Sequence, residues 1–290
     1  FMRRNTLMAV GFDLARLKVL GTPIPFLRDV AQLLNFADQE VQTGAGQFSV
    51  SSTGTLAWLQ STIKADSGIR MAPVAIDRQG RARPLDAPSS EYGGYVAVSP
   101  DGRQLALNYR DGLWVRDLAR GTLTNLPGGG GMPRWTPDGQ RISSLATIDG
   151  IDQLVWQRAD GTGAVKVLAR EPGLPSSWSP DGRQLALCRP LNPNRFKDFR
   201  TWIATIAGDT VTLKPTQEEE AWPEFSPDGR WLAYGFGASG HYEVYVRPYP
   251  GPGPRQQVSL NGGGMPAWSS SGRELFFVTA PDTGRGLYHA

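Results

Sequence analysis

Cysteine and histidine are almost absent from this chain, and their scarcity excludes several classes of site. The single cysteine, Cys188, excludes a disulfide within the chain and any zinc site built on cysteine ligands. Two histidines, His241 and His289, are too few for a metal centre with several histidine ligands. No apolar run approaches the roughly 18 residues of a membrane-spanning helix, so we expect no membrane span in this chain.

Net charge and helical periodicity are also low. The 30 lysines and arginines exceed the 27 acidic residues by only +3, and their scatter along the chain predicts no nucleic-acid partner. Only residues 30–41 have a helix-like pattern, and we expect a short helix or a long loop there. Because the chain starts at Phe1 without a signal peptide, we expect it to derive from a longer protein.

Glycine and proline are abundant instead, at 35 and 23 of 290 residues, and many of them belong to one repeated turn. The clearest copies are VSPDGRQLAL at 98–107, WSPDGRQLAL at 178–187 and FSPDGRWLAY at 225–234. Weaker copies occupy 50–59, 135–145 and 268–277. The anchoring glycines recur about every 44 residues, the period of a four-stranded propeller blade: Gly54, Gly102, Gly139, Gly182, Gly229 and Gly272.

The residues of this repeat predict two strands and the turn between them. Proline presets φ, aspartate hydrogen-bonds within the turn, and glycine takes the position with positive φ. The following strand alternates apolar and polar residues, as at 183–187. We therefore predict an all-β fold, a single domain over 1–290, formed by a six-bladed β-propeller of four-stranded antiparallel blades. Strands at 7–12 and 23–27 would close the ring by completing the blade begun at Met265; seven blades are the alternative.

The repeated aromatic-Ser-Pro-Asp-Gly-Arg turn resembles that of the TolB-type, WD-repeat-like β-propeller family over about residues 44–290. The segments 6–19, 21–25 and 47–51 are similar to the propellers attached to bacterial Ser/Thr protein kinases. This resemblance implies binding of a protein partner or a small ligand, and an extracytoplasmic location. It implies no kinase activity, because the glycine loop, catalytic loop and Asp-Phe-Gly motif of kinases are missing from the sequence.

Two recurring patterns have structural interpretations that we favour over functional ones. The Asp-Gly pairs suggest calcium binding, but a turn role explains better why they repeat in every copy. The glycine runs 128–131 and 262–264 suggest phosphate binding, yet neither is followed by Lys-Ser/Thr or by a helix. We expect these runs to be flexible entries to a crowded channel. No Gly-x-Ser-x-Gly elbow of a serine hydrolase is present.

Blade topology predicts that the loops preceding the inner strands share one face with the loops between second and third strands. Its charged residues are Asp66, Glu91, Asp111, Asp149, Asp152, Glu218, Glu219, Glu220, Glu224, His241, Asp282, Arg134, Arg189, Arg195, Lys197 and Arg200. For a binding funnel we select Glu91, Tyr92, Met132, Arg134, Trp222 and Met265. For a calcium-dependent hydrolase, Glu220 and Glu224 would be the metal ligands, and Glu224 and His241 the catalytic candidates.

These candidates leave three functional hypotheses. The first is a non-catalytic sensor or interaction module that binds a partner or ligand on the loop face. The second is a hydrolase of esters, lactones or phosphotriesters with calcium as cofactor, because six-bladed lactonases hold calcium in such a funnel. The third is a scaffold whose incomplete last blade accepts a strand from another chain. The sequence contains no complete catalytic motif, so it does not decide whether the protein is an enzyme.

Overall fold

The computed structural model describes residues 2–3, 6–13, 18–27, 32–34, 42–46, 48–50, 55–61, 71–76, 81–85, 92–109, 112–192, 195–216, 219–237, 242–251, 253–260 and 262–278. Every regular element among these residues is a β-strand, and none forms a helix that could cross a membrane. The chain divides into two compact units. The first unit comprises Phe1–Arg28, Gln32–Gly46 and Ser179–Ala290, and the second Asp29–Ala31 and Gln47–Trp178.

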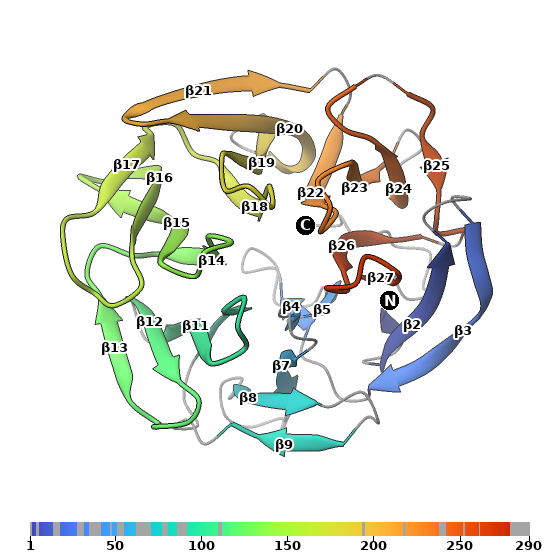
Figure 1. Ribbon diagram of the computed structural model, residues 1–290, viewed down its shortest axis with the longest axis horizontal. Helices are drawn as coiled ribbons and strands as arrows, with labels where there is room; N and C mark the ends of the chain where they lie inside the picture. The colour runs from blue at the N-terminus through green and yellow to red at the C-terminus, as the bar shows by residue number, and fades with distance from the viewer. Residues whose placement is uncertain are drawn as a thin grey trace. The chain divides into compact units, whose positions relative to one another are not determined.

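The second unit consists of antiparallel sheets whose strands follow one another in chain order (Figure 1). The first sheet contains β6 (Phe48–Val50), β7 (Leu56–Ser61), β8 (Met71–Ile76) and β9 (Ala82–Pro84). The next contains β10 (Tyr92–Val98), β11 (Gln104–Tyr109), β12 (Gly112–Asp117) and β13 (Leu123–Leu126). The third contains β14 (Gly131–Trp135), β15 (Arg141–Ile148), β16 (Ile151–Arg158) and β17 (Lys166–Ala169), and β18 (Leu174–Trp178) ends the unit.

The first unit contains the remaining strands. Its longest hairpin joins β19 (Gln184–Asn192) to β20 (Arg195–Ala207), which then pairs with β21 (Thr210–Pro215). A complete sheet follows, with β22 (Glu220–Phe225), β23 (Trp231–Phe236), β24 (Glu243–Pro248) and β25 (Gln256–Gln257). Three smaller sheets are β26 (Gly264–Trp268) with β27 (Leu275–Val278), β1 (Met2–Arg3) with β2 (Thr6–Asp13) and β3 (Lys18–Leu27), and β4 (Gln32–Leu34) with β5 (Gln42–Gly46).

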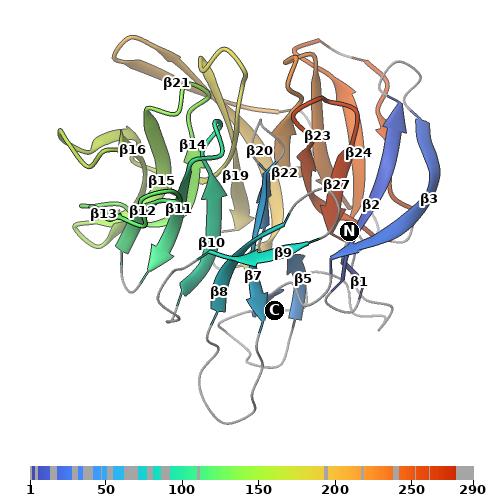
Figure 2. The ribbon, with the colours of Figure 1, turned by 60° about the horizontal axis from the view of Figure 1, so that its bottom comes forward.

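The prediction of four-stranded antiparallel blades is confirmed, but the predicted number is not. With the sheet β18-β19-β20-β21, the described residues form five four-stranded sheets rather than six, and no seventh. The sixth anchor contributes only the pair β26–β27, because the chain supplies no further described strands after Val278. One antiparallel bridge, Gly11 to Glu274, joins these strands to β2, which lies along β27 (Figure 2).

The expectation of a helix or loop over 30–41 is wrong for residues 32–34. These residues form β4, which pairs with β5, so pairing with another strand overrides a short helical pattern. Residues 30–31 and 35–41 lie outside the described part of the chain.

The turn role of the aspartates is confirmed by identical geometry in successive sheets. In one turn the Ser179 hydroxyl donates to the Asp181 carboxylate at 2.6 Å, and the Arg183 amide donates to the same oxygen at 3.1 Å. These two bonds hold the pKa of Asp181 below its ordinary value. Gly182 has φ of 68°, the conformation that glycine adopts without steric cost.

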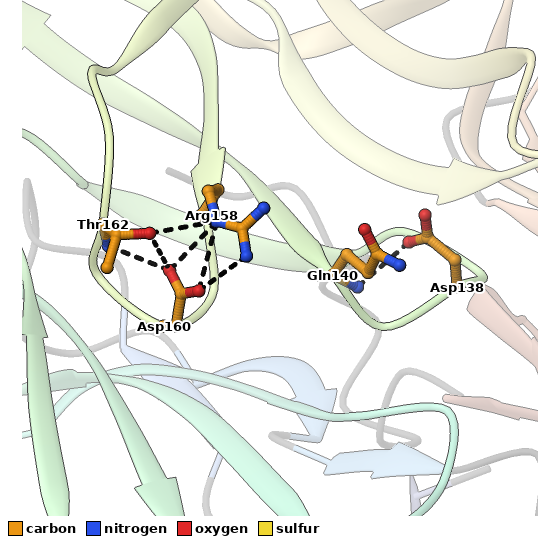
Figure 3. Close-up of polar contacts among 5 residues, drawn as sticks. All are labelled: Asp138, Gln140, Arg158, Asp160 and Thr162. Carbon is orange, nitrogen blue, oxygen red and sulfur yellow. Dashed lines mark hydrogen bonds and ion pairs between the residues drawn. The ribbon is translucent and has the colours of Figure 1, made fainter.

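The same arrangement recurs around Asp101, Asp138 and Asp228. Figure 3 shows Asp138 accepting the amide of Gln140 at 3.0 Å. In the same sheet Asp160 accepts hydrogen bonds from two guanidinium nitrogens of Arg158 and from both the amide and the hydroxyl of Thr162, and these bonds lower the pKa of Asp160 (Figure 3). Each turn carboxylate accepts hydrogen bonds from its own turn, and among the described residues these carboxylates do not come together as a calcium site would require.

In two of the repeats, the tryptophan before the turn connects neighbouring sheets. The buried indole of Trp135 donates to the Ala97 carbonyl at 2.8 Å, linking β14 to β10. Trp268 makes the equivalent bond to the Glu224 carbonyl at 3.2 Å, linking β26 to β22. These two bonds link β14 to β10 and β26 to β22, and buried apolar residues pack around each pair of strands.

Candidate functional site

The inner strands share a bulge that sequence reasoning missed. Strands β10, β14, β22 and β26 all shift register against their partners in their first half. Within three of these bulges the residue before proline has positive φ: 57° at Met132, 49° at Trp222 and 48° at Met265. For a residue other than glycine, this backbone conformation lowers the stability of the folded state by about 1–2 kcal/mol. Three of the predicted funnel residues therefore occupy equivalent, strained positions.

Trp222 is half-buried and contacts several residues of the first unit. Its amide donates to the Cys188 sulfur at 2.8 Å. Its ring lies 5.2 Å from that of Tyr242 and 6.0 Å from that of Phe199. A Cβ at Gly235 would lie 3.0 Å from the indole and 3.2 Å from the Tyr242 ring, so glycine here allows close packing of the two rings. The strained Trp222 is therefore a rigid aromatic surface rather than a mobile side chain.

Arg134 lies on β14, two residues after Met132. Its Nε donates to the Ser176 carbonyl at 2.5 Å and one terminal nitrogen donates to the Pro133 carbonyl at 2.8 Å. Burial raises the pKa of Tyr95, and the positive charge of Arg134 opposes that rise only in part. A cation fixed by backbone carbonyls beside a half-buried phenol is a polar element suited to orienting a ligand.

Glu220, one of the two predicted metal ligands, is bound to an arginine. It is 2 % exposed, and its two carboxylate oxygens accept bonds of 2.7 and 3.1 Å from Arg247 on β24. Burial lowers the pKa of Arg247, but the hydrogen bonds and charge of Glu220 outweigh it, so the pKa is raised. Sequence reasoning missed Arg247, whose signal is a charge within the alternating strand YEVYVRP.

The other predicted residues divide between described and undescribed parts of the chain. Glu224 lies half-buried on β22, whereas Glu91 and His241 lie outside the described residues, as does the side chain of Tyr92. Thr147 donates to Asp152 at 2.6 Å in the β15–β16 turn, and Asp149 has φ of 53° there. Among the described residues, no three His, Cys, Asp or Glu side chains converge as a metal site would require.

The charged loop-face residues are likewise only partly described. Glu219 is exposed, and Arg189 and Arg200 are half-buried on β19 and β20. For Arg195 and Lys197 only the backbone, within β20, is described. Outside the described part lie Asp66, Asp111, Glu218 and Asp282.

The glycine runs are packed against the protein rather than open to a phosphate. A Cβ at Gly130 would lie 1.8 Å from the Leu145 carbonyl oxygen. The amides of Gly262 and Gly263 already donate to the Glu243 carboxylate and to the Tyr242 carbonyl, at 2.7 Å each. These glycines permit close approach between strands, and their backbone donors are used internally. The expected entry to a crowded channel is thus a closely packed segment.

No family model matches the chain. Among curated proteins, it is similar to "Uncharacterized peptidase YuxL" of Bacillus subtilis (strain 168), with 29% identity over 165 residues. The match covers 51% of this chain and 23% of the relative, so the chain spans about a quarter of that protein's length.

Solved structures show the fold. A putative TolB from Agrobacterium tumefaciens aligns with a TM-score of 0.60 at 21% identity, covering 71% of this chain and 76% of that one. A chain of a nidogen/laminin complex aligns with a TM-score of 0.55 at 14% identity, and the alignment covers 84% of this chain and 89% of that one. A gluconolactonase from Xanthomonas campestris aligns with a TM-score of 0.57 at 14% identity, and the alignment covers 81% of this chain and 82% of that one. The chain is therefore an all-β propeller of four-stranded antiparallel blades. Its structural neighbours include TolB-like propellers.

Proposed function

We propose that this propeller is a non-catalytic interaction module that binds a protein partner through the bulged ends of its inner strands. The observation that carries the proposal is the repeated strained residue before proline, at Met132, Trp222 and Met265. Strain of this kind persists where it serves binding, and rigid aromatic and methionine side chains are typical of protein interfaces. The nidogen/laminin neighbour is itself part of a protein complex. A small ligand on the same surface is the narrower form of this proposal.

The test is partner capture with matched variants. Wild-type protein, Trp222→Ala and Val167→Ser would be immobilised and exposed to an extract of the source cells. Val167 serves as the control because it is 38% exposed on β17, the last strand of its sheet, away from the bulges. We expect a protein that wild type and control retain and Trp222→Ala loses, with the same pattern when the purified partner is titrated. Equal capture by all three proteins would overturn the assignment of the surface.

The alternative is a calcium-dependent hydrolase acting on esters, lactones or phosphotriesters, with Glu220 and Glu224 as ligands and His241 and Glu224 as catalytic groups. The gluconolactonase neighbour favours it. Melting with chelator and then with Ca²⁺, beside a substrate panel, separates the two proposals, since a ligand of the folded state raises its melting temperature. A calcium-dependent rise with turnover, both reduced by Glu224→Gln, would establish the hydrolase and remove the interaction module.

We also propose that residues 1–290 form one domain whose ring closes through a sixth blade, β26-β27-β2-β3. Support comes from the Gly11–Glu274 bridge and from Val10, which is buried with Leu275 and Phe277. Oxidation of a Gly11→Cys/Glu274→Cys variant should form a disulfide, whereas Gly11→Cys/Arg273→Cys should not. If neither forms and mass measurement shows concentration-dependent association, the last blade instead accepts a strand from another chain, as the scaffold hypothesis requires.

The kinase-propeller resemblance of the N-terminal segment extends this proposal to a sensor outside the cytoplasmic membrane. The test is a fusion of the full-length parent protein to a reporter that is active only outside the cytoplasm. Reporter activity would support the sensor, and a cytoplasmic reporter signal would exclude it.

A further inference from the structure

One carboxylate joins the segment that precedes β26 to the start of β24. Glu243 is the first residue of β24, and its two carboxylate oxygens accept hydrogen bonds from the Ser259 hydroxyl and from the Gly262 amide, the latter at 2.7 Å. Ser259 is buried, and its Oγ also accepts a hydrogen bond from the Val244 amide at 2.8 Å. Because hydrogen bonds to a charged acceptor are stronger than those to a neutral one, residues 259 and 262 are both fixed to β24.

The segment fixed in this way leads to the bulged end of β26. The Gly263 amide donates to the Tyr242 carbonyl at 2.7 Å, and the Tyr242 ring lies 5.2 Å from that of Trp222. A Cβ at Gly263 would lie 2.5 Å from the Ser259 Oγ, so glycine allows the segment to pack against itself. Two residues further on is Met265, with φ of 48°. The fixed segment is therefore continuous with the binding surface proposed above.

Leu260 lies between the two fixed residues. Its side chain is 80% exposed, the largest exposed fraction among the large apolar side chains that the structure describes. A single exposed leucine is ordinary by itself. Here, however, Ser259 beside it and Gly262 two residues later are both bonded to the same carboxylate. An apolar side chain on a backbone that is already fixed loses less conformational entropy when a partner binds it.

The glycine run of the second unit has no such carboxylate. Strand β12, the third of its sheet, begins with Gly112, whereas β24, the third of its own sheet, begins with Glu243. In that run the Gly130 amide donates to the Ser144 hydroxyl at 3.4 Å, which is longer than an ordinary hydrogen bond. Met132, which follows this run, also has positive φ. The chain thus contains a second bulge of the same kind without the carboxylate, which serves as an internal control.

We propose that Glu243 is a positioning residue of the interaction surface, and that it holds Leu260 for insertion into an apolar pocket of the protein partner. The inference rests on the proposed function and adds the chemistry of the contact to it. The partner would supply an apolar pocket for one leucine beside the bulged strand, and Glu243 would act through the backbone without touching the partner.

The first measurement concerns the carboxylate and needs no partner. With methionine labelled by ¹³C at the ε-methyl group, Met265 and Met132 report on the two bulges in one NMR spectrum, and replacement of each by leucine assigns its signal. Glu243→Leu removes both acceptor oxygens. We expect it to shift the Met265 signal and to speed amide exchange at Gly262 by roughly tenfold or more, while the Met132 signal stays unchanged.

Glu243→Gln is the conservative variant. Its amide keeps an oxygen for the Gly262 amide and offers an N–H to the Ser259 Oγ, so the wild-type spectrum and exchange rate should return. If Glu243→Leu leaves the Met265 signal and the Gly262 exchange unchanged, Glu243 positions nothing. If it shifts the Met132 signal equally, its effect is a general loss of structure and the positioning role is also excluded.

The second measurement is the affinity for the purified partner that the capture experiment identifies. Leu260→Ser should bind roughly tenfold or more weakly than wild type with an unchanged melting temperature, because its side chain is exposed. Val167→Ser, at another exposed apolar residue, should bind as wild type. Glu243→Leu should also weaken binding, and Glu243→Gln should not.

The outcomes separate this inference from the function on which it rests. If Leu260→Ser binds as wild type while Trp222→Ala does not, the interaction module stands and Leu260 is not its anchor. If both variants bind as wild type, the proposed surface is wrong as a whole. A dimer of this chain that Leu260→Ser dissociates would replace the separate partner by a second copy.

Discussion

Replacement of Arg247 by methionine should strongly destabilise the first unit. The substitution keeps most of the side-chain volume but leaves Glu220, 2 % exposed, as a buried carboxylate without its bidentate partner. Breaking a buried pair in this way costs about 3–5 kcal/mol. For a chain of this size that corresponds to a fall in melting temperature of roughly 6–15 °C.

The control is Arg230→Met in the same sheet. Arg230 also contacts a carboxylate, that of Asp228 at 2.8 Å, but its side chain is 79% exposed. An exposed pair contributes about 0–1 kcal/mol, so this variant should unfold almost as wild type does. Urea denaturation followed by tryptophan fluorescence gives the free energy of unfolding for each protein.

The double variant Glu220→Leu/Arg247→Met completes the test. Removing both charges should recover most of the stability lost in Arg247→Met, because an apolar pair of similar volume needs no solvation. If Arg247→Met costs no more than Arg230→Met, the ion pair is not what stabilises this sheet. A calcium-dependent stabilisation that only Glu220→Gln removes would then restore Glu220 as a metal ligand.

Three further predictions concern the turns and the sheet contacts. Asp181→Ala should lower stability at pH 7 by roughly 0.5–1.5 kcal/mol; because the folded pKa of Asp181 is depressed, this difference should vanish as the pH falls through that pKa in a pH series of denaturation curves. Gly130→Ala should cost several times more than Gly251→Ala in thermal melts, because an added Cβ meets backbone at 1.8 Å only at Gly130. Trp135→Phe should cost about 1–3 kcal/mol, since the Ala97 carbonyl loses its donor; no loss would show that the indole bond is dispensable.

The repeated turn was predictable because its chemistry is local. Proline, aspartate and glycine act within a few residues of one another, so the sequence alone predicts the Ser179–Gly182 turn and the strands beside it. The blade count was harder, because the sixth blade depends on whether Gly11 reaches Glu274 from the far end of the chain. Local patterns contain no information about such a pairing.

The candidate site was also only partly predictable from local sequence patterns. Trp222 and Met265 were selected as aromatic and methionine residues of a binding funnel, but their positive φ depends on a bulge against the next strand. Glu220 was predicted as a ligand because it lies among the carboxylates of the predicted loop face. Its partner Arg247 is 27 positions later and becomes a neighbour only when β22 and β24 join one sheet. The sequence therefore shows which residue types are present, but it does not show which residue each charged side chain pairs with.

The single bridge between Gly11 and Glu274 has a consequence for biosynthesis. All other sheets form from strands that leave the ribosome one after another, whereas β2 meets β27 only after about 260 more residues have been made. At roughly 5–20 residues per second, β2 and β3 wait on the order of 10–50 s for their neighbour. During that interval Val10, which is buried with Leu275 and Phe277 in the folded chain, has no such residues to pack against. The face of β2 that carries Val10 is thus open to misassociation until β27 has been made.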